Sequence, residues 1–155
     1  MQQAIVRVVC AIGQSGQLGL EGKLPWEGNR SPPYVADVAR FFDLTRGHVL
    51  LAGPKTIASV PEFARVDREL FTVRSSMDPQ ETLGRFAGRI VFIGGGPPVW
   101  NAYAHLVSHW DVTRLPYDGP ADRWFDPRWL VGGSRASTST ALRPANAPRP
   151  LQPNG

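Results

Sequence analysis

The sequence contains little of what several classes of protein require. It has a single cysteine, Cys10, so an internal disulfide framework and a cysteine metal cluster are excluded. It has no run of about 18 apolar residues, so a membrane-spanning helix is not expected. The N-terminus carries neither the basic segment nor the small-residue cleavage site of a secretory signal. We therefore expect a cytoplasmic protein with no membrane partner.

Concentrated charge and metal-binding patterns are also scarce. The net charge is +4, and three arginines within residues 132–155, a segment without acids, contribute most of it. Basic residues do not cluster with aromatic residues elsewhere, which argues against a nucleic-acid partner. His48, His105 and His109 lack the spacing of metal ligands, so we expect no metal site.

The chain does contain enough apolar sequence for one folded domain. It has 155 residues, of which 42% are hydrophobic. Short apolar strand patterns alternate with helix patterns, which is typical of an α/β fold whose mostly parallel sheet carries helices on both faces. The predicted strands are 4–11, 48–52, 69–73, 89–93 and 109–115. The predicted helices are 34–46, opened by two prolines, and 54–60, 78–88 and 97–107.

The C-terminal part differs in composition from the rest of the chain. From Gly132 onward, the sequence is rich in Ser, Thr, Pro and Gly. We assign residues 1–131 to one domain and residues 132–155 to a separate C-terminal segment. That segment is expected to hold at most one edge strand, at 136–142, followed by a disordered tail at 144–155.

Three consecutive glycines, Gly94, Gly95 and Gly96, follow a predicted strand and precede a predicted helix. Residues without side chains allow unusual φ angles and let a ligand approach the main chain. In parallel sheets, ligands bind beyond the carboxyl ends of the strands, which is where this triplet lies. A plain tight turn would give the same pattern, and Pro97 and Pro98 remove two N–H donors from such a site. Both interpretations stay open.

Asp37 is an acid on the apolar side of a predicted helix. On a helical wheel it lies near Phe41 and Leu44, whereas Arg40 lies on the other side. A buried carboxylate needs a partner within the fold, a proton, or a ligand that donates hydrogen bonds. The alternative is an acid at the edge of the apolar stripe whose side chain reaches water.

Together, these patterns resemble the dihydrofolate reductase family over residues 4–129. The resemblance rests on segments that occur in the family's order. They are LGLEGKLPW (18–26), YVADVARFF (34–42), LLAGPKTIASV (50–60), TVRSS (72–76), VFIGGG (91–96), DVTRL (111–115) and DRWF (122–125). The resemblance implies a monomeric, NADPH-dependent oxidoreductase that reduces dihydrofolate to tetrahydrofolate in one-carbon metabolism. Antifolate inhibitors could bind such a protein, and a divergent copy could confer trimethoprim resistance.

The same resemblance implies roles for individual residues. Asp37 would bind the pterin ring while water delivers a proton to N5, Trp26 would anchor a mobile loop, and Thr113 would support Asp37 by a hydrogen bond. The implied substrate-binding residues, which wall the pterin and aminobenzoyl groups or, for Arg68, pair with the glutamate, are Val9, Cys10, Asp37, Val38, Phe41, Val60, Arg68, Ile93 and Trp100. The implied cofactor-binding residues are Ala11, Leu18, Gly53, Lys55, Thr56, Arg74, Ser75, Gly94, Gly95 and Gly96.

The chain departs from the family pattern near the cofactor and at the C-terminus. Pro54 stands where a basic residue usually follows the glycine, and two prolines replace the basic residue that usually follows the glycine triplet. Lys55, Arg74 and Ser75 could still favour NADPH, because a 2′-phosphate attracts cations. The final antiparallel strand pair of the family is expected to be reduced or altered here.

Two alternatives to dihydrofolate reduction stay open. The first keeps the fold and changes the substrate to another pterin or a ribosylaminopyrimidine. The second is a non-catalytic, reductase-like protein for binding or assembly, which the altered C-terminus and the proline substitutions suggest. Asp37 and the Leu-Pro-Trp sequence at 24–26 favour folate among these substrates.

Overall fold

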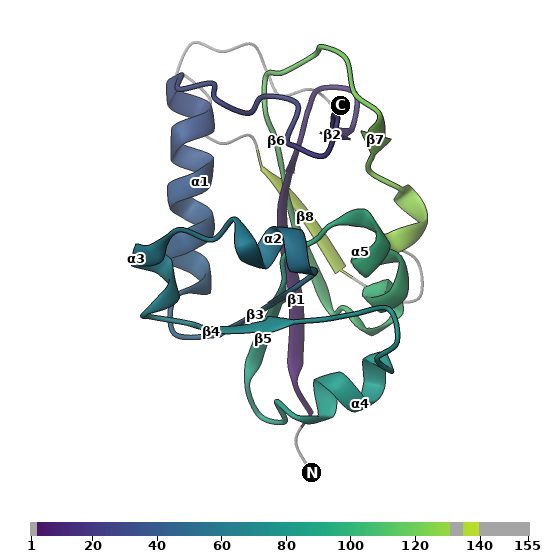
Figure 1. The fold of residues 1–155 in the computed structure, drawn as a ribbon. Coiled ribbons are helices and arrows are strands. Elements are labelled where there is room, and N and C mark those ends of the chain that lie inside the picture. Colours follow the sequence, from purple (N-terminus) through teal and green to yellow (C-terminus); the bar gives the residue numbers. More distant parts are fainter. Residues whose placement is uncertain (1–2, 131–134, 140–155) are drawn as a thin grey trace.

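A parallel sheet forms the centre of the structure (Figure 1). The computed structural model describes residues 3–130 and 135–139. The strands lie in the order β4-β3-β5-β1-β6-β8, and neighbouring strands are parallel throughout. Their bounds are β1 (Ile5–Ile12), β3 (Val49–Ala52), β4 (Glu69–Thr72), β5 (Ile90–Ile93), β6 (His109–Arg114) and β8 (Arg135–Ser139). The predicted α/β class is confirmed, and all five predicted strands are present.

Helices connect the strands and cover both faces of the sheet. They are α1 (Pro32–Thr45), α2 (Pro54–Ala58), α3 (Glu62–Arg65), α4 (Pro79–Gly84) and α5 (Pro97–Tyr103), with 3₁₀ turns η1 (Ala104–Leu106) and η2 (Pro127–Leu130). Figure 1 shows α1 and α5 on opposite sides of β1. Each predicted helix is present, whereas α3 was not predicted because four residues are too few to show a helical period.

Two of the three hydrophobic clusters lie on opposite faces of the sheet, because side chains alternate along the strands. Phe92 packs with the cluster that faces α1, α2 and α3, whereas its neighbour Ile93 packs with the cluster that faces α4 and α5. Successive strand residues point to opposite faces of a sheet, so residues adjacent in sequence end up in different clusters. The two faces can therefore differ in function.

A second, two-stranded sheet forms from two segments in which we predicted no strand. β2 (Gln17–Gly19) pairs in antiparallel fashion with β7 (Arg123–Trp124). Strands of two or three residues have no periodic pattern, and their pairing joins distant parts of the chain, so sequence patterns could not predict them. This pair ties the long loop after β1 to the segment after β6.

The C-terminal edge of the main sheet differs from the family pattern, as expected. β8 pairs with β6 in parallel, so within residues 3–130 and 135–139 no antiparallel pair closes the main sheet. The predicted tail at 144–155 and the last part of the predicted edge strand lie outside the described residues, and the domain boundary at 131 stays a prediction. Over the same described ranges, no helix has the length and apolar composition to cross a membrane.

Candidate active site

Asp37 lies on α1 and is half-buried between this helix and the sheet. Burial raises the pKa of Asp37 to about 6; the nearby Arg40 cation opposes this rise and the Asp111 carboxylate on β6 adds to it. A carboxylate removed from water interacts more strongly with hydrogen-bond donors than a solvated one does. Asp37 is therefore not a freely hydrated surface acid, and it is available to a ligand that donates hydrogen bonds.

An ion pair beside Asp37 was missed by sequence reasoning. Arg40 Nη2 donates a hydrogen bond of 2.5 Å to Asp111 Oδ2, and Arg40 Nη1 lies 3.5 Å from Oγ1 of the buried Thr113. We expected Arg40 on the side of α1 away from Asp37, which is wrong, because residues three apart leave a helix on neighbouring positions and the long side chain of Arg40 reaches across to β6. An acid in the middle of a buried parallel strand was the signal that could have identified Asp111 as a partner.

Three of the predicted wall residues lie together. Val9 of β1 and Val60, which follows α2, are buried in one hydrophobic cluster, and Phe41 of α1 packs against it. This cluster is on the same face of the sheet as α1, which carries Asp37. The structure thus places an apolar surface and a half-buried carboxylate on one face, an arrangement that suits a flat heterocycle with polar edges.

Three other predicted substrate residues are not brought to that face. The side chains of Ile93, Cys10 and Trp100 pack in or against the cluster under α5, because Cys10 and Ile93 alternate with residues that face α1. The Ile93 carbonyl accepts a hydrogen bond of 3.2 Å from Trp100 Nε1. Burial raises the pKa of the Cys10 thiol, and the carboxylates of Asp37 and Asp111 raise it further, so this thiol stays neutral. The side chains of these residues belong to the core in this structure.

The loop after β2 is anchored by an aromatic contact. Trp26 is buried, and its ring centroid lies 6.0 Å from that of Tyr34 on α1 and 5.6 Å from that of Tyr117. Ala11, at the end of β1, packs against the same group. Leu18 of β2 is also buried, in the larger cluster. The predicted role of Trp26 as a loop anchor is consistent with this packing and stays a prediction.

The glycines of the triplet have different structural explanations. One applies to Gly94 and Gly95, and another applies to Gly96. A Cβ on Gly94 would lie 3.0 Å from Leu50 Cδ1, and Gly95 has a φ of +110° in a position where a Cβ would lie 3.3 Å from the Trp100 ring. Packing and backbone conformation therefore require these two glycines. At Gly96, by contrast, the nearest described atom to a Cβ would be Pro98 Cδ at 4.0 Å. Open main chain for a ligand is found at Gly96.

The turns after β3 and β5 lie against each other. Gly53 N donates a hydrogen bond of 3.0 Å to Gly95 O, and a Cβ on Gly53 would meet Val99 at 3.6 Å. The peptide bond between Gly95 and Gly96 is cis. The carboxyl ends of two neighbouring strands thus form a continuous stretch of main chain with few side chains, which is where ligands of parallel sheets bind.

Exposed cations and hydroxyls follow β3 and β4 at the same edge of the sheet. Lys55 and the partly buried Thr56 come after β3, and Arg74 and Ser75 come after β4, its direct neighbour. Within the part of the chain that the structure describes, no hydrogen bond or ion pair engages the side chains of Lys55 and Arg74. Cations and hydroxyl donors suit phosphate oxygens. These residues therefore fit the phosphates of a dinucleotide cofactor next to the glycine turns.

Arg68 has a structural environment that does not suit its predicted role. Its side chain is fully buried, and it donates hydrogen bonds of 2.7 and 3.0 Å to Asp67 Oδ1 and one of 2.9 Å to the Phe42 carbonyl. A further bond reaches Thr45 Oγ1. A contact with a substrate carboxylate would need an exposed guanidinium. Arg68 instead fastens the C-terminal end of α1 to the segment before β4.

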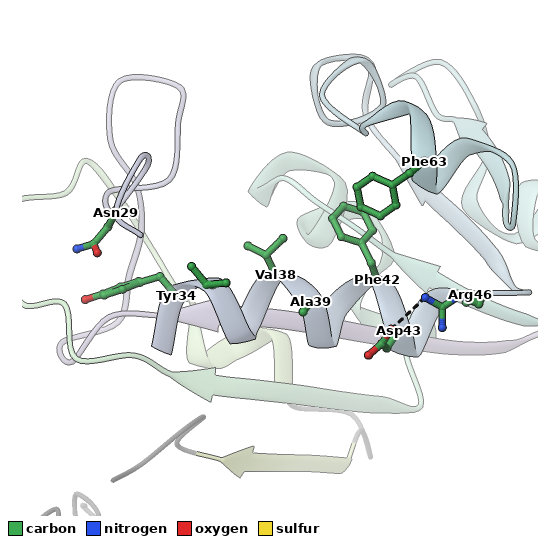
Figure 2. Close-up of a pocket in the computed structure, with 9 residues that line it drawn as sticks. Asn29, Tyr34, Val38, Ala39, Phe42, Asp43, Arg46 and Phe63 are labelled. Carbon is green, nitrogen blue, oxygen red and sulfur yellow. Dashed lines mark hydrogen bonds and ion pairs between the residues drawn. The ribbon is translucent and has the colours of Figure 1, made fainter. Parts of the chain in front are cut away.

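A groove of about 460 Å³ runs along the outer side of α1 (Figure 2). Val38, which we predicted to contact the substrate, lines this groove and is 48% exposed. Phe42 and Phe63 form an edge-to-face pair above it, with ring centroids 5.3 Å apart, and the Asp43–Arg46 ion pair lies at its end. The groove presents an apolar surface, and Val38, the residue that follows Asp37 on α1, is part of it.

Comparison with known proteins identifies relatives of different closeness. No protein-family model matches the chain. A dihydromethanopterin reductase from Methylorubrum extorquens is 67% identical over 128 residues, which cover 83% of this chain and 95% of that protein. Type 8 dihydrofolate reductases from Escherichia coli and Shigella sonnei are 26% identical over 145 residues, which cover 81% of this chain and 83% of those proteins.

These identities overturn the prediction of dihydrofolate as the substrate, and they give no support to the antifolate and trimethoprim expectations that depended on it. The relative at 67% identity is named for a different pterin, and the dihydrofolate reductases are far more distant. We had taken Asp37 and the Leu-Pro-Trp sequence as evidence for folate. That inference was wrong because an acid that recognises the pterin ring cannot distinguish between two substrates that both contain it.

The family resemblance and the fold class agree with the comparisons and the structure. The relatives are pterin reductases, and the parallel α/β sheet matches the fold that the resemblance implies. The alternative of another pterin as substrate is better supported than the main prediction. The chain belongs to the dihydrofolate reductase-like family of oxidoreductases, which act with a reduced nicotinamide cofactor.

Proposed function

We propose that the chain reduces dihydromethanopterin to its tetrahydro form, with NADPH as the reductant. The observation that carries this proposal is the 67% identity to the dihydromethanopterin reductase over 95% of the length of that protein. The half-buried acid on α1 and the apolar cluster beside it supply a site of suitable chemistry.

Asp37 would recognise the pterin ring. Its carboxylate accepts hydrogen bonds from the ring N–H and the 2-amino group, and its half-buried position strengthens these charge-assisted bonds. With a pKa of about 6, the carboxylate is mostly ionised at neutral pH and still close enough to titration to favour a proton on its ligand. Water would deliver that proton to N5 of the pterin.

The apolar residues around Asp37 would align the ring and limit access of water. Val9, Phe41 and Val60 form one packed surface on this face, and such a surface fixes the orientation of a flat heterocycle. The groove along α1, lined by Val38 and Phe42, would accept the part of the substrate that extends beyond the pterin.

Reduced nicotinamide supplies a hydride, here to C6 of the pterin, when the cofactor is bound. Gly96 would leave main chain free for the cofactor to approach. Lys55, Arg74 and Ser75 would hold its phosphates, and the cations would favour NADPH over NADH because the 2′-phosphate adds negative charge. Pro54, Pro97 and Pro98 leave fewer N–H donors at these turns, so side chains carry more of this binding.

The test is a steady-state assay of NADPH oxidation with dihydromethanopterin as the acceptor, with identification of the reduced pterin by chromatography. We expect saturable turnover and a larger kcat/KM with NADPH than with NADH. Turnover with NADH equal to that with NADPH would contradict the cofactor assignment alone. An absence of reduced pterin with either cofactor would contradict the proposed function.

A further inference from the structure

Two charged residues lie beside Asp37 and have no place in the proposed contacts with the pterin. Arg40 follows Asp37 by three residues on α1, so the two side chains leave the helix on neighbouring positions. Asp111 projects from the centre of β6, one of the strands against which α1 packs, and its side chain is 15% exposed. The 2.5 Å contact between Arg40 Nη2 and Asp111 Oδ2 joins the helix to the sheet next to the acid.

The location of this pair distinguishes it from the other ion pairs of the protein. The Arg89–Glu69 pair has a similar length, 2.6 Å, but both of its side chains are more than 40% exposed and it lies where β4 and β5 begin. Pairs that are exposed to water act only weakly on other groups. The Arg40–Asp111 pair is less exposed and acts on Asp37 across a partly water-free space.

We infer that Arg40 and Asp111 are positioning residues for Asp37, the pterin-binding acid. Asp111 holds the guanidinium of Arg40 one helical turn from Asp37. The inference rests on the proposed function only for the role of Asp37 in binding a pterin. Arg40 and Asp111 act through Asp37 and touch no reacting atom.

The groups that face Asp37 have opposite effects on its ionisation. Among the described residues they are Arg40 on α1, Asp111 on β6 and the Cys10 thiol on β1. The cation stabilises the ionised carboxylate, Asp111 destabilises it, and the thiol is neutral because its own pKa is raised. The Arg40 cation and the Asp111 anion therefore shift the pH at which Asp37 is half protonated in opposite directions, and their effects partly cancel.

The test is a pH titration of Asp37 in the free, full-length protein by ¹³C NMR of labelled aspartate side chains, with Asp37→Asn to assign the resonance. Arg40→Gln removes the cation and should move the midpoint up by about one pH unit, the low end of the effect of a neighbouring opposite charge. Asp111→Asn removes the anion and should move the midpoint down. The double variant should give a value between those of the single variants.

Two controls keep the test decisive. Arg40→Lys retains the cation and should keep the midpoint near that of the wild type, and Arg89→Gln, which removes the exposed pair, should leave it unchanged. If Arg40→Gln fails to fold, Arg40→Lys and Asp111→Asn still give the comparison. Midpoints that do not move, or that move in the same direction for Arg40→Gln and Asp111→Asn, would overturn the inference.

Failure of the inference and failure of the proposed function are distinguishable, because the titration needs no substrate. If the assay with dihydromethanopterin succeeds, the pH dependence of kcat/KM should move with the NMR midpoint in each variant. KM should change more than kcat, since Asp37 acts by binding the ring. A purely structural ion pair would lower stability and leave both the pH profile and the NMR midpoint in place, and that result would contradict the inference.

Discussion

The two faces of the sheet are built on the same strands and differ in the side chains that pack on them. On the α5 face, Trp100, Trp110 and Trp129 pack against one another, with Trp110 and Trp129 stacked at an interplanar angle of 4° and a centroid distance of 5.7 Å. On the α1 face, the half-buried Asp37 and the Arg40–Asp111 pair lie beside apolar side chains. One face is closed by the protein itself, and the other keeps the half-buried carboxylate of Asp37 next to an ion pair.

Burial of a side chain therefore has opposite effects on stability on the two faces. Removal of an aromatic ring from the closed face should cost stability, since a cavity replaces a packed side chain. Removal of the charge from Asp37 should cost activity and gain stability, since a buried carboxylate is unfavourable in the absence of its ligand. Four predictions, made on three substitutions, test this contrast.

The largest expected effect is on turnover. Asp37→Asn keeps the shape of the side chain and removes its charge, so kcat/KM for the pterin should fall about 10³-fold, in the range of removing a catalytic acid or base. Glu69→Gln, an acid in the exposed pair at the other end of the strands, should change kcat/KM little. Near-normal turnover by Asp37→Asn would remove the distinction between the two faces.

On the closed face, Trp129→Ala should lower the free energy of unfolding by about 3 kcal/mol or slightly more. The ring is buried between Trp100, Trp110 and Phe125, and its loss leaves a cavity that the neighbouring rings fill poorly. Urea denaturation measures the loss. Val66→Ala, at a residue that is 84% exposed, is the matched control and should cost less than about 0.5 kcal/mol. Equal losses in both variants would contradict the proposed packing.

Arg68→Ala should also act on stability, by about 2–3 kcal/mol, although it lies on the α1 face. The substitution leaves the Phe42 carbonyl and the Thr45 hydroxyl without their buried donor. We expect KM for the pterin to stay within about twofold, which corresponds to less than 1 kcal/mol. A large rise in KM without loss of stability, measured by kinetics and denaturation together, would show that Arg68 binds substrate after all.

The smallest expected effect is a gain of stability that depends on pH. The native pKa of Asp37, about 6, lies above the ordinary value of 3.8, so the stability contributed by the protonated group is complete below pH 4 and lost as the pH rises through 6. Asp37→Asn should therefore be more stable than the wild type at pH 8, by about 1–2 kcal/mol, and similar to it at pH 4. Thermal melts at the two pH values measure this difference, and a loss of stability at pH 8 would reverse the predicted sign.

The sequence allowed the main elements of the fold to be predicted because they follow periodic patterns. The apolar strands and the long helix α1 carry signals of their own, and the prolines at the start of α1 mark its boundary. β2 and β7 could not be predicted, because each is too short for a pattern and each exists only through the other. The parallel pairing of β8 with β6 depends on tertiary contacts rather than on local sequence.

Only those residues of the site that belong to a recognisable sequence pattern could be predicted. Asp37 was identified because an acid interrupts an apolar helix face, and Gly96 because a glycine turn follows a strand. Arg40 was placed on the wrong side, although residues three apart leave a helix on neighbouring positions, and a helical wheel does not show how far a long side chain reaches. Cys10 and Ile93 were assigned to the site although the alternation along β1 and β5 turns their side chains to the closed face.

The identity of the substrate could not be predicted from the sequence, for a physical reason. Residues that contact only the pterin ring cannot distinguish substrates that share this ring, so they indicate the class of substrate and not its member. Selectivity depends on groups that touch the rest of the substrate, and the groove beside Val38 is the described surface best placed to do so. Its apolar lining includes Val35, Val38, Phe42 and Phe63, and of these only Val38 was predicted from the sequence to contact the substrate.

The most direct test of the account is a comparison of kcat/KM for dihydromethanopterin and dihydrofolate, measured on the same preparation of the full chain with NADPH. The account predicts a clear preference for dihydromethanopterin, with kcat/KM for both pterins lowered by a similar large factor in Asp37→Asn because the acid recognises the ring that they share. A preference for dihydrofolate, or near-normal turnover of either pterin after the loss of this carboxylate, would contradict it.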